Sequence, residues 1–447
     1  MTFCCNYKRR NNMSEFYVYP NSMRPHGCGK AYMLRDGEGV DWFVNCGVTM
    51  PLDHKTAEFL RREFPWTAPS RVLSLRKTIG LGDRTSLAAD AFFRVFKGKD
   101  AVPVPVQHSG RDETLTGFSF EEMLDAATFA AYREGYMEPW GADASHIQSF
   151  EQIETALAAG YTMISVDCAG LLDMGGEPGE DVLELYLGRT FSVEGMSITY
   201  DRMALDDCCR LLGQVLALAA EIYESYVRTG NIDFVLSLEG MKTPTTPAQH
   251  YFLANELLRR GIVVQAIAPV FNGVFQQGQD YDGDTAQFEA ELKIHSAIAR
   301  AFGYKLCLNH MEDKTSLLQT VSQYTKGTLH LRTEGLSWIE AIRLIAQKDA
   351  SLYKIVYSMA MTAWPMAQEY FHANAALQTL PEPGSVKDAL LPTLFGRPAL
   401  RSLISLTYPQ LIRSQLREKL FAFWKKNAED YFTLVQAPLA DLLLRLE

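Results

Sequence analysis

The sequence predicts an α/β fold, a TIM-like (β/α) barrel with a β-rich N-terminal lead-in and a C-terminal helical extension. From about residue 100 onward, short β-branched apolar runs alternate with longer stretches of helical periodicity, the pattern of parallel strands joined by helices. Polar residues gather where several of these strands end, and in a barrel such ends converge on one mouth. No glycine-rich phosphate-binding turn follows a predicted strand, which disfavours an open doubly wound sheet.

The barrel is assigned to residues 71–380, because eight strand–helix units need about 250 residues. Its predicted strands are Val102–Gln107, Thr162–Asp167, Phe234–Glu239, Val263–Pro269, Lys305–Leu308 and Thr328–Arg332. Its predicted helices, each with apolar residues three and four apart, are Phe120–Arg133, Ser149–Ala159, Met203–Arg228, Pro247–Arg260, Thr285–Phe302 and Ser337–Ala346.

The two flanking segments differ from the barrel in pattern. Within residues 1–70, Gly37, Gly39 and Gly47 punctuate short mixed runs, which predicts the small β-rich lead-in. Residues 381–447 are strongly helical, with an apolar face from Leu411 to Leu446. Such a face is typical of core packing or of a dimer surface, so a homo-oligomer is possible.

Composition restricts the kinds of partner. The formal net charge of −10 argues against nucleic acid, and the basic Lys8-Arg9-Arg10 patch is interpreted as part of a solvated leader. No run is long and apolar enough to cross a bilayer, and no secretion signal is recognisable, so no membrane partner is expected. The eight cysteines include the pairs Cys4-Cys5 and Cys208-Cys209 but no CxxC, which indicates reduced thiols and a cytoplasmic protein.

Imidazoles and carboxylates near strand ends are the candidate chemical groups, because they bind divalent cations or transfer protons. We assign His146, His310 and His330 to a divalent metal ion of unknown identity, and Asp167 and Glu239 to catalysis. Gln107, His108, Lys314 and Arg332 are assigned to substrate binding. Any one of these residues alone is more often a hydrogen-bonded structural residue.

Three polar or glycine-containing segments are interpreted as scaffolding. Gly80–Arg84 has the composition of a glycine turn with an acid–base pair. Thr246 and Pro247 are predicted to cap and begin a helix. Asp280–Asp284 suggests a calcium loop but lacks the later Glu, which favours a helix-capping turn.

Many ordered blocks resemble the tagaturonate/fructuronate epimerases of hexuronate breakdown, over roughly residues 70 to 410. The blocks are Leu75-Arg76, Gly82-Asp83-Arg84, Glu134-Gly135-Tyr136, Glu138-Pro139, Gly141-Ala142-Asp143-Ala144, Gly160-Tyr161-Thr162-Met163, Asp167, Thr243-Pro244-Thr245, His250-Tyr251-Phe252, Asp280-Tyr281, Gly283-Asp284, His295, Ile298-Ala299-Arg300, Gly303-Tyr304-Lys305, Asp313-Lys314, Thr325-Lys326-Gly327 and Ser337-Trp338. The resemblance implies epimerisation of a 5-keto sugar acid with a divalent metal. The inverted carbon lies β to the ketone, so the implied route is retro-aldol cleavage and re-formation of a carbon–carbon bond.

Carried over residue by residue, the family pattern implies an altered site. The first metal histidine falls on His146 and the third on His330, but the second meets Asn309, with His310 one place later. The base position holds Ser145 and the acid position holds Val235, neither of which replaces a carboxylate in proton transfer.

Two functions therefore stay open. The first is a metal-dependent sugar-acid epimerase of the isomerase class, with metal held by His146, His330 and either His310 or Asn309, and with Asp167 or Glu239 as base. The alternative is a catalytically inactive paralogue that binds a carbohydrate or partners an active homologue. A small-molecule sugar or sugar acid is the expected ligand of both.

Overall fold

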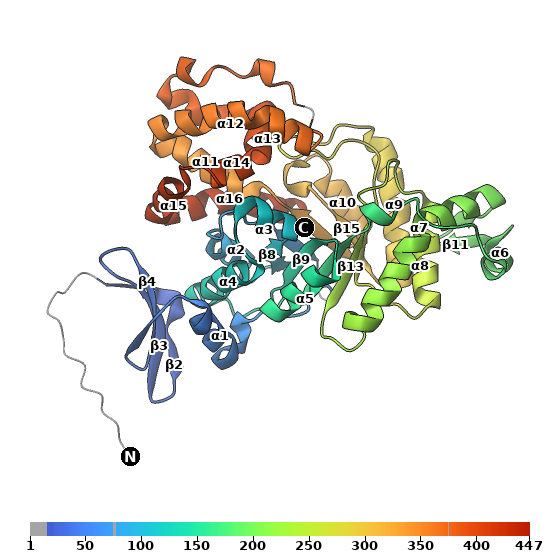
Figure 1. The fold of residues 1–447 in the computed structure, drawn as a ribbon, viewed down its shortest axis with the longest axis horizontal. Helices are drawn as coiled ribbons and strands as arrows, with labels where there is room; N and C mark the ends of the chain where they lie inside the picture. The colour runs from blue at the N-terminus through green and yellow to red at the C-terminus, as the bar shows by residue number, and fades with distance from the viewer. Residues whose placement is uncertain (1–15, 75–76, 374) are drawn as a thin grey trace. The chain divides into compact units, whose positions relative to one another are not determined.

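A computed structural model describes residues 16–74, 77–373 and 375–447 (Figure 1). Among the sequence features noted above, the Cys4-Cys5 pair, the Lys8-Arg9-Arg10 patch and Leu75-Arg76 lie outside these residues. The chain divides into two compact units. One ends at Ala68 and also includes Thr128–Met137, and the other comprises Pro69–Ala127 and Glu138–Glu447. The domain boundaries predicted at residues 70 and 380 stay predictions.

The smaller unit contains an antiparallel sheet, which confirms the β-rich lead-in. Its strands run in the order β1, β3, β4, β5, and β2 pairs with β3 on the same edge as β1. The elements are β1 Tyr17–Val18, β2 Arg24–His26, β3 Gly29–Arg35, β4 Asp41–Asn45, β5 Val48–Pro51 and α1 His54–Glu63. Met33, Phe43, Leu60 and Tyr132 form its apolar core, and the Trp66 ring stacks on Tyr132 with centroids 5.5 Å apart.

The larger unit is a closed parallel barrel. Its sheet runs in the order β7-β6-β16-β15-β14-β13-β10-β9-β8. β7 and β8 stand at opposite ends of this order but are separated in sequence only by Pro105, so they form one interrupted strand that closes the sheet and gives eight strand positions. The strands are β6 Thr78–Leu81, β7 Val102–Val104, β8 Val106–His108, β9 Ala142–Ile147, β10 Met163–Asp167, β13 Asp233–Ser237, β14 Ala266–Ala268, β15 Lys305–Leu308 and β16 Leu329–Thr333.

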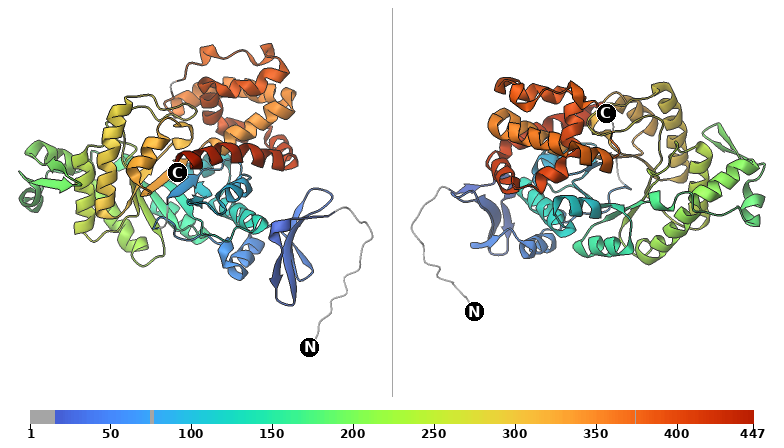
Figure 2. Two further views of the ribbon diagram at one scale, coloured as in Figure 1. Left: turned by 180° about the vertical axis from the view of Figure 1, so that it is seen from behind. Right: turned by 45° about the horizontal axis from the view of Figure 1, so that its top comes forward.

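Helices follow the strands and cover the outside of the barrel (Figures 1 and 2). They are α2 Ala89–Phe96, α3 Gly110–Thr116, the part of α4 Phe120–Glu134 that precedes Thr128, α5 Phe150–Ala159, α7 Arg202–Ile222, α8 Pro247–Arg259, α9 Thr285–Phe302, α10 Leu318–Thr325 and α11 Leu336–Lys348. All six predicted helices are present. The predicted cap of α8 is also confirmed, because the Thr246 hydroxyl accepts a hydrogen bond from the Gln249 amide and Pro247 occupies the first turn.

Two barrel strands were missed by the sequence interpretation. The Gly80–Arg84 segment was expected to be a turn, but Thr78–Leu81 forms β6 and pairs with both β7 and β16. A Cβ at Gly80 would lie 2.2 Å from Oε1 of Gln107 and 3.2 Å from Cγ of Arg332, so a larger residue would require these interior side chains to shift. β9 was not predicted either, because Ala142–Ile147 alternates small and polar residues.

Further helices complete the larger unit. Between β10 and α7 lie α6 Glu180–Tyr186 and the hairpin of β11 Thr190–Val193 and β12 Met196–Thr199. The C-terminal elements are α12 Ala350–Tyr370, α13 Pro398–Leu406, α14 Tyr408–Ile412, α15 Arg417–Lys426 and α16 Ala428–Arg445, as predicted for a helical extension (Figure 2). The Trp424 indole donates to the Ala341 carbonyl of α11 at 2.9 Å, so these helices pack on the barrel helices. Within the described ranges, every helix is too short or too polar to cross a bilayer.

Candidate active site at the barrel mouth

Two histidines and two glutamates alternate around the mouth of the barrel. His146 is the penultimate residue of β9, and Glu239, His310 and Glu334 follow β13, β15 and β16. Nδ1 of His146 lies 3.9 Å from Glu239 and its Nε2 lies 3.5 Å from Glu334. Nε2 of His310 lies 3.7 Å from Glu239 and its Nδ1 lies 3.6 Å from Glu334. Each imidazole thus bridges both carboxylates, and we call these four residues the His–Glu ring.

Both histidines of the ring have a left-handed backbone conformation. φ is +47° at His146 and +55° at His310. A non-glycine residue in this region is uncommon, and such conformations concentrate at functional sites, where the surrounding structure enforces them. The unusual backbone therefore aims both imidazoles at the same pair of carboxylates.

The ring is electrostatically coupled. Burial opposes the charged form of His146, but the hydrogen bond to Glu334 and the charge of Glu239 outweigh it and raise the pKa of His146. Burial likewise acts to raise the pKa of Glu334, but His310 and His146 hold that pKa well below its usual value. Within the ring, the opposite charges shift both pKa values in the direction that favours the charged form of each group.

The ring lines a cavity of about 500 Å³. Barrel loops form one part of its wall, and the C-terminal helices supply the rest through the end of α12, Leu406 and Tyr408. Its polar lining residues are Arg84, Arg111, Asp112, His146, Asp167, Glu239, Gln276, Gln277, His310, Glu334, Tyr370, His372 and Tyr408. A cavity of this volume holds a small polar ligand.

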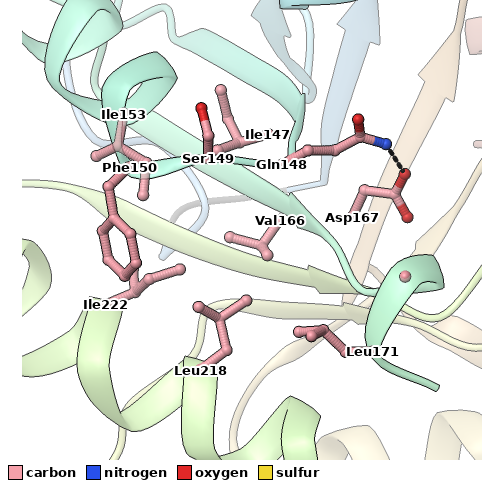
Figure 3. Close-up of a pocket in the computed structure, with 11 residues that line it drawn as sticks. Ile147, Gln148, Ser149, Phe150, Ile153, Val166, Asp167, Leu171, Leu218 and Ile222 are labelled. Atoms are coloured by element: carbon pink, nitrogen blue, oxygen red, sulfur yellow. Dashed lines mark hydrogen bonds between the residues drawn. The ribbon is translucent and has the colours of Figure 1, made fainter. Parts of the chain in front are cut away.

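Asp167 stands at the junction of this cavity and a second, largely apolar pocket. The second pocket, of about 440 Å³, is lined by side chains such as Phe150, Leu218 and Ile222 (Figure 3). Nε2 of Gln148 donates to Oδ2 of Asp167 at 2.9 Å, and the Ala169 amide donates to Oδ1 at 2.9 Å. These bonds fix the carboxylate at the end of β10, where it lines both cavities.

Hydrogen bonds from Lys314 and to Asp313 hold the loop after β14 in place. The buried Lys314 ammonium donates to the carbonyls of Gln276 and Gln279 at 2.9 and 2.8 Å. Asp313 accepts from the Gly278 amide at 2.7 Å and pairs with Arg401. Lys314 is therefore engaged with backbone and is not among the residues that line the cavity.

A sequence model of the tagaturonate epimerase (UxaE) family matches residues 34–446. The chain belongs to this family. It is 33% identical over 415 residues to the tagaturonate/fructuronate epimerase of Thermotoga maritima, which covers 89% of this chain and 85% of that protein. It is also similar to crystal structures of the fructuronate-tagaturonate epimerase UxaE from Cohnella laeviribosi, native and with one glycerol. Each is 31% identical, covers 97% of this chain and 96% of that chain, and has a TM-score of 0.93.

In this member of the tagaturonate epimerase family, the predicted site residues divide into two groups. His146, His310, Asp167 and Glu239 come together around the cavity. His330 does not line it. Its Nδ1 lies 2.9 Å from the Thr78 hydroxyl, which also accepts from the Lys305 ammonium at 3.2 Å. His330 precedes Glu334 by four residues, about 13 Å along an extended chain, so the two face different levels of the barrel interior.

Arg332 occupies the level between His330 and the mouth. It is fully buried, and its Nη2 donates to Oδ2 of Asp143 at 2.6 Å and also contacts Ser165. Gln107 and His108 are buried beside a small chamber under His146, and Nε2 of His108 lies 2.8 Å from the Phe118 carbonyl oxygen. Arg332 is not among the residues lining the main cavity, and neither are Gln107 and His108.

The three positions that were expected to be altered in this family member lie in three different surroundings. Ser145 is buried beside the same small chamber. Val235 lies inside the barrel in an apolar cluster with Met163, Ala266 and Cys307. Asn309 lines a pocket of about 350 Å³ that shares Glu239 and His310 with the main cavity.

Sequence reasoning missed several polar residues of the cavity, among them Glu334, Gln277 and Arg111. Glu334 directly follows β16, so its position after a strand was the available signal. Gln277 lies in a loop, donates to Oε2 of Glu334 at 2.9 Å and accepts from Arg84 at 3.0 Å, a role no local motif indicates. Arg111 is the second residue of α3, three residues after the interrupted strand ends at His108, and it lines the cavity.

Proposed function

We propose that the chain is a divalent-metal-dependent epimerase of a keto sugar acid similar to tagaturonate or fructuronate, and that it works by retro-aldol chemistry. The observation that carries this proposal is the His–Glu ring, which lines a polar cavity at the barrel mouth of a tagaturonate epimerase family member. Barrel enzymes place their chemistry at this end of the strands.

The ring fits a divalent cation by its donor chemistry. Imidazole nitrogens and carboxylate oxygens are common ligands of zinc and related metals, and each imidazole of the ring lies 3.5 to 3.9 Å from both carboxylates. His146, His310, Glu239 and Glu334 would hold the metal. A bound cation would supply Lewis acidity, which stabilises negative charge that develops on substrate oxygens.

Asp167 is the proposed base. It lies outside the ring, lines the cavity and is oriented by Gln148 and the Ala169 amide. Asp167 takes the proton of the hydroxyl on the carbon β to the ketone, and that carbon becomes an aldehyde. The bond between the α and β carbons breaks, and its electrons pass to the ketone to give an enediolate. After the aldehyde turns its other face, the bond re-forms and Asp167 returns the proton, so no external oxidant or reductant is required.

The test is turnover of tagaturonate with Mn²⁺, Ni²⁺ or Zn²⁺, followed by ¹³C NMR. The proposal expects fructuronate to accumulate toward equilibrium, and Asp167→Asn to reduce kcat about a hundredfold or more. Asp206→Asn, at an exposed ion pair with Arg202, serves as the matched control and should leave kcat unchanged. Absence of epimer with every metal would overturn the proposal, and carbohydrate binding without turnover would favour the inactive-paralogue alternative.

A further inference from the structure

The cavity has a surplus of acidic groups. Asp112, Asp167, Glu239 and Glu334 line it, against the two arginines Arg84 and Arg111. A ligand carboxylate that lies beside these acidic groups needs a cationic group that is free to pair with it. Which of the two arginines is free is therefore informative about the ligand.

The Arg84 side chain already makes several contacts within the protein. Its Nη1 donates to the Ser405 carbonyl, its Nη2 donates to Oε1 of Gln277, and its guanidinium lies 3.8 Å from the centroid of the Tyr408 ring. It is also buried. Both terminal nitrogens of the guanidinium and one of its faces are therefore in contact with the protein. We interpret Arg84 as a structural residue of the cavity wall.

Arg111 differs from Arg84 in its contacts. Its side chain is exposed on the cavity wall, and within the described ranges no acceptor takes a hydrogen bond from its guanidinium and no carboxylate forms an ion pair with it. The adjacent Asp112 is engaged elsewhere, because it accepts from the Tyr408 hydroxyl at 2.9 Å and from the Ser109 hydroxyl at 2.6 Å. Partial desolvation lowers the pKa of Arg111, but the charges of Glu334 and Asp112 outweigh it and raise that pKa, so the guanidinium is charged.

We infer that Arg111 is the residue that binds the carboxylate of the substrate and so selects sugar acids over neutral sugars. A guanidinium offers two parallel N–H groups that match a carboxylate. The His–Glu ring would then face the ketone and hydroxyl end of the same molecule. This inference rests on the proposed function and names the feature of the substrate that the cavity recognises.

The assignment has a consequence for the reaction. In a 5-keto sugar acid cleaved at the carbon β to the ketone, the carboxylate stays on the fragment that becomes the aldehyde. Arg111 therefore holds the fragment that must rotate before the bond re-forms. Loss of this anchor raises the fraction of cleavage events that release the free aldehyde acid instead of the epimer.

Binding of gluconate tests the inference without requiring catalysis, because gluconate has a carboxylate and hydroxyls but no ketone. Calorimetry should show that Arg111→Met weakens gluconate binding roughly tenfold or more and that Arg111→Lys weakens it less. Sorbitol, in which an alcohol replaces the carboxylate, should bind wild type and Arg111→Met equally. Arg202→Met, at an exposed ion pair on α7, is the matched control and should bind gluconate like the wild type.

Equal affinity of wild type and Arg111→Met for gluconate would overturn the inference, as would a wild type that binds gluconate no better than sorbitol. If the protein turns over tagaturonate, a higher KM of Arg111→Met for tagaturonate but not for the corresponding neutral ketose adds support. If no epimer forms but Arg111→Met still loses gluconate affinity, the proposed function fails while the carboxylate site stands.

Discussion

Nε2 of Gln277 donates a hydrogen bond of 2.9 Å to Oε2 of Glu334. Because Oε1 of Gln277 accepts from Arg84, the amide is held in one orientation and presents a donor to Glu334. The same glutamate faces His146 and His310, so the position of a ring carboxylate depends on a loop residue outside the ring.

Substitution of this amide should impair turnover more than binding. Gln277→Leu removes the donor to an ionised carboxylate, an interaction worth about 1.5–3 kcal/mol. Steady-state kinetics should show kcat reduced roughly tenfold to a hundredfold with a smaller change in KM. Gln287→Leu, on the exposed face of α9, is the control. An unchanged kcat in Gln277→Leu would mean that Glu334 is positioned without the amide.

Gly278 should be intolerant of a side chain. Its φ is +89°, and a Cβ there would lie 2.3 Å from the backbone nitrogen of Ser402. Gly278→Ala is therefore expected to cost about 2 kcal/mol or more and to displace the adjacent Gln277. Thermal unfolding should show a lower Tm and kinetics a lower kcat. Gly176→Ala, with open space at the Cβ and an ordinary φ, should alter neither; a Tm of Gly278→Ala equal to that of wild type would contradict the packing described here.

Metal content should depend on ring histidines and not on histidines near them. His310→Ala removes one of the two imidazoles of the ring, so metal measured by elemental analysis after dialysis should fall well below that of the wild type. His372→Ala removes an exposed histidine that lines the same cavity outside the ring, and should retain metal. Equal retention in both variants would place the cation elsewhere. Chelation with EDTA should abolish activity, and added metal should restore it.

Lys305 should make stability depend on pH. Burial at the base of the barrel lowers the pKa of Lys305 to about 7, whereas an unfolded lysine titrates near about 10.4. Between these values the unfolded chain binds more protons, so the free energy of unfolding rises with pH, by up to about 1.4 kcal/mol per pH unit from this group. Below pH 7 the group contributes no slope.

Lys305→Met removes this titration. Its gain in Tm over the wild type should be largest at pH 7 and below and should shrink toward pH 10. Thermal melts from pH 6 to pH 10 measure the difference, with the exposed Lys293→Met of α9 as control. A gain that stays constant across this range would show that Lys305 titrates normally in the folded chain.

The barrel was predictable where its strands are apolar. β15 was predicted with its observed bounds, and the predicted run 328–332 differs from β16 by one residue at each end, because these short apolar runs lie between clear helical patterns. β6 was missed because Gly80 looks like a turn residue in sequence. Its actual requirement is the space that Gln107 and Arg332 occupy inside the closed barrel, which only the tertiary structure reveals.

The sequence could predict which functional residues lie near strand ends, but not how deep in the barrel each side chain lies. His146, Asp167, Glu239 and His310 were correctly expected to gather at one mouth, since parallel strands end at one face. His330, Arg332 and Glu334 share one inward-facing side of β16 and its continuation, so alternation alone gives no signal for which of them reaches the cavity. Only the register against neighbouring strands shows that Glu334 does.

The left-handed backbone at His146 and His310 lowers the stability of the fold in order to place two imidazoles at the cavity. Each such conformation costs on the order of 1 kcal/mol for a residue with a Cβ, a cost that glycine avoids. A mutant library screened only for survival at high temperature would therefore be enriched in glycine at both positions and would lose both imidazoles. Directed evolution of this scaffold needs a turnover selection in every round.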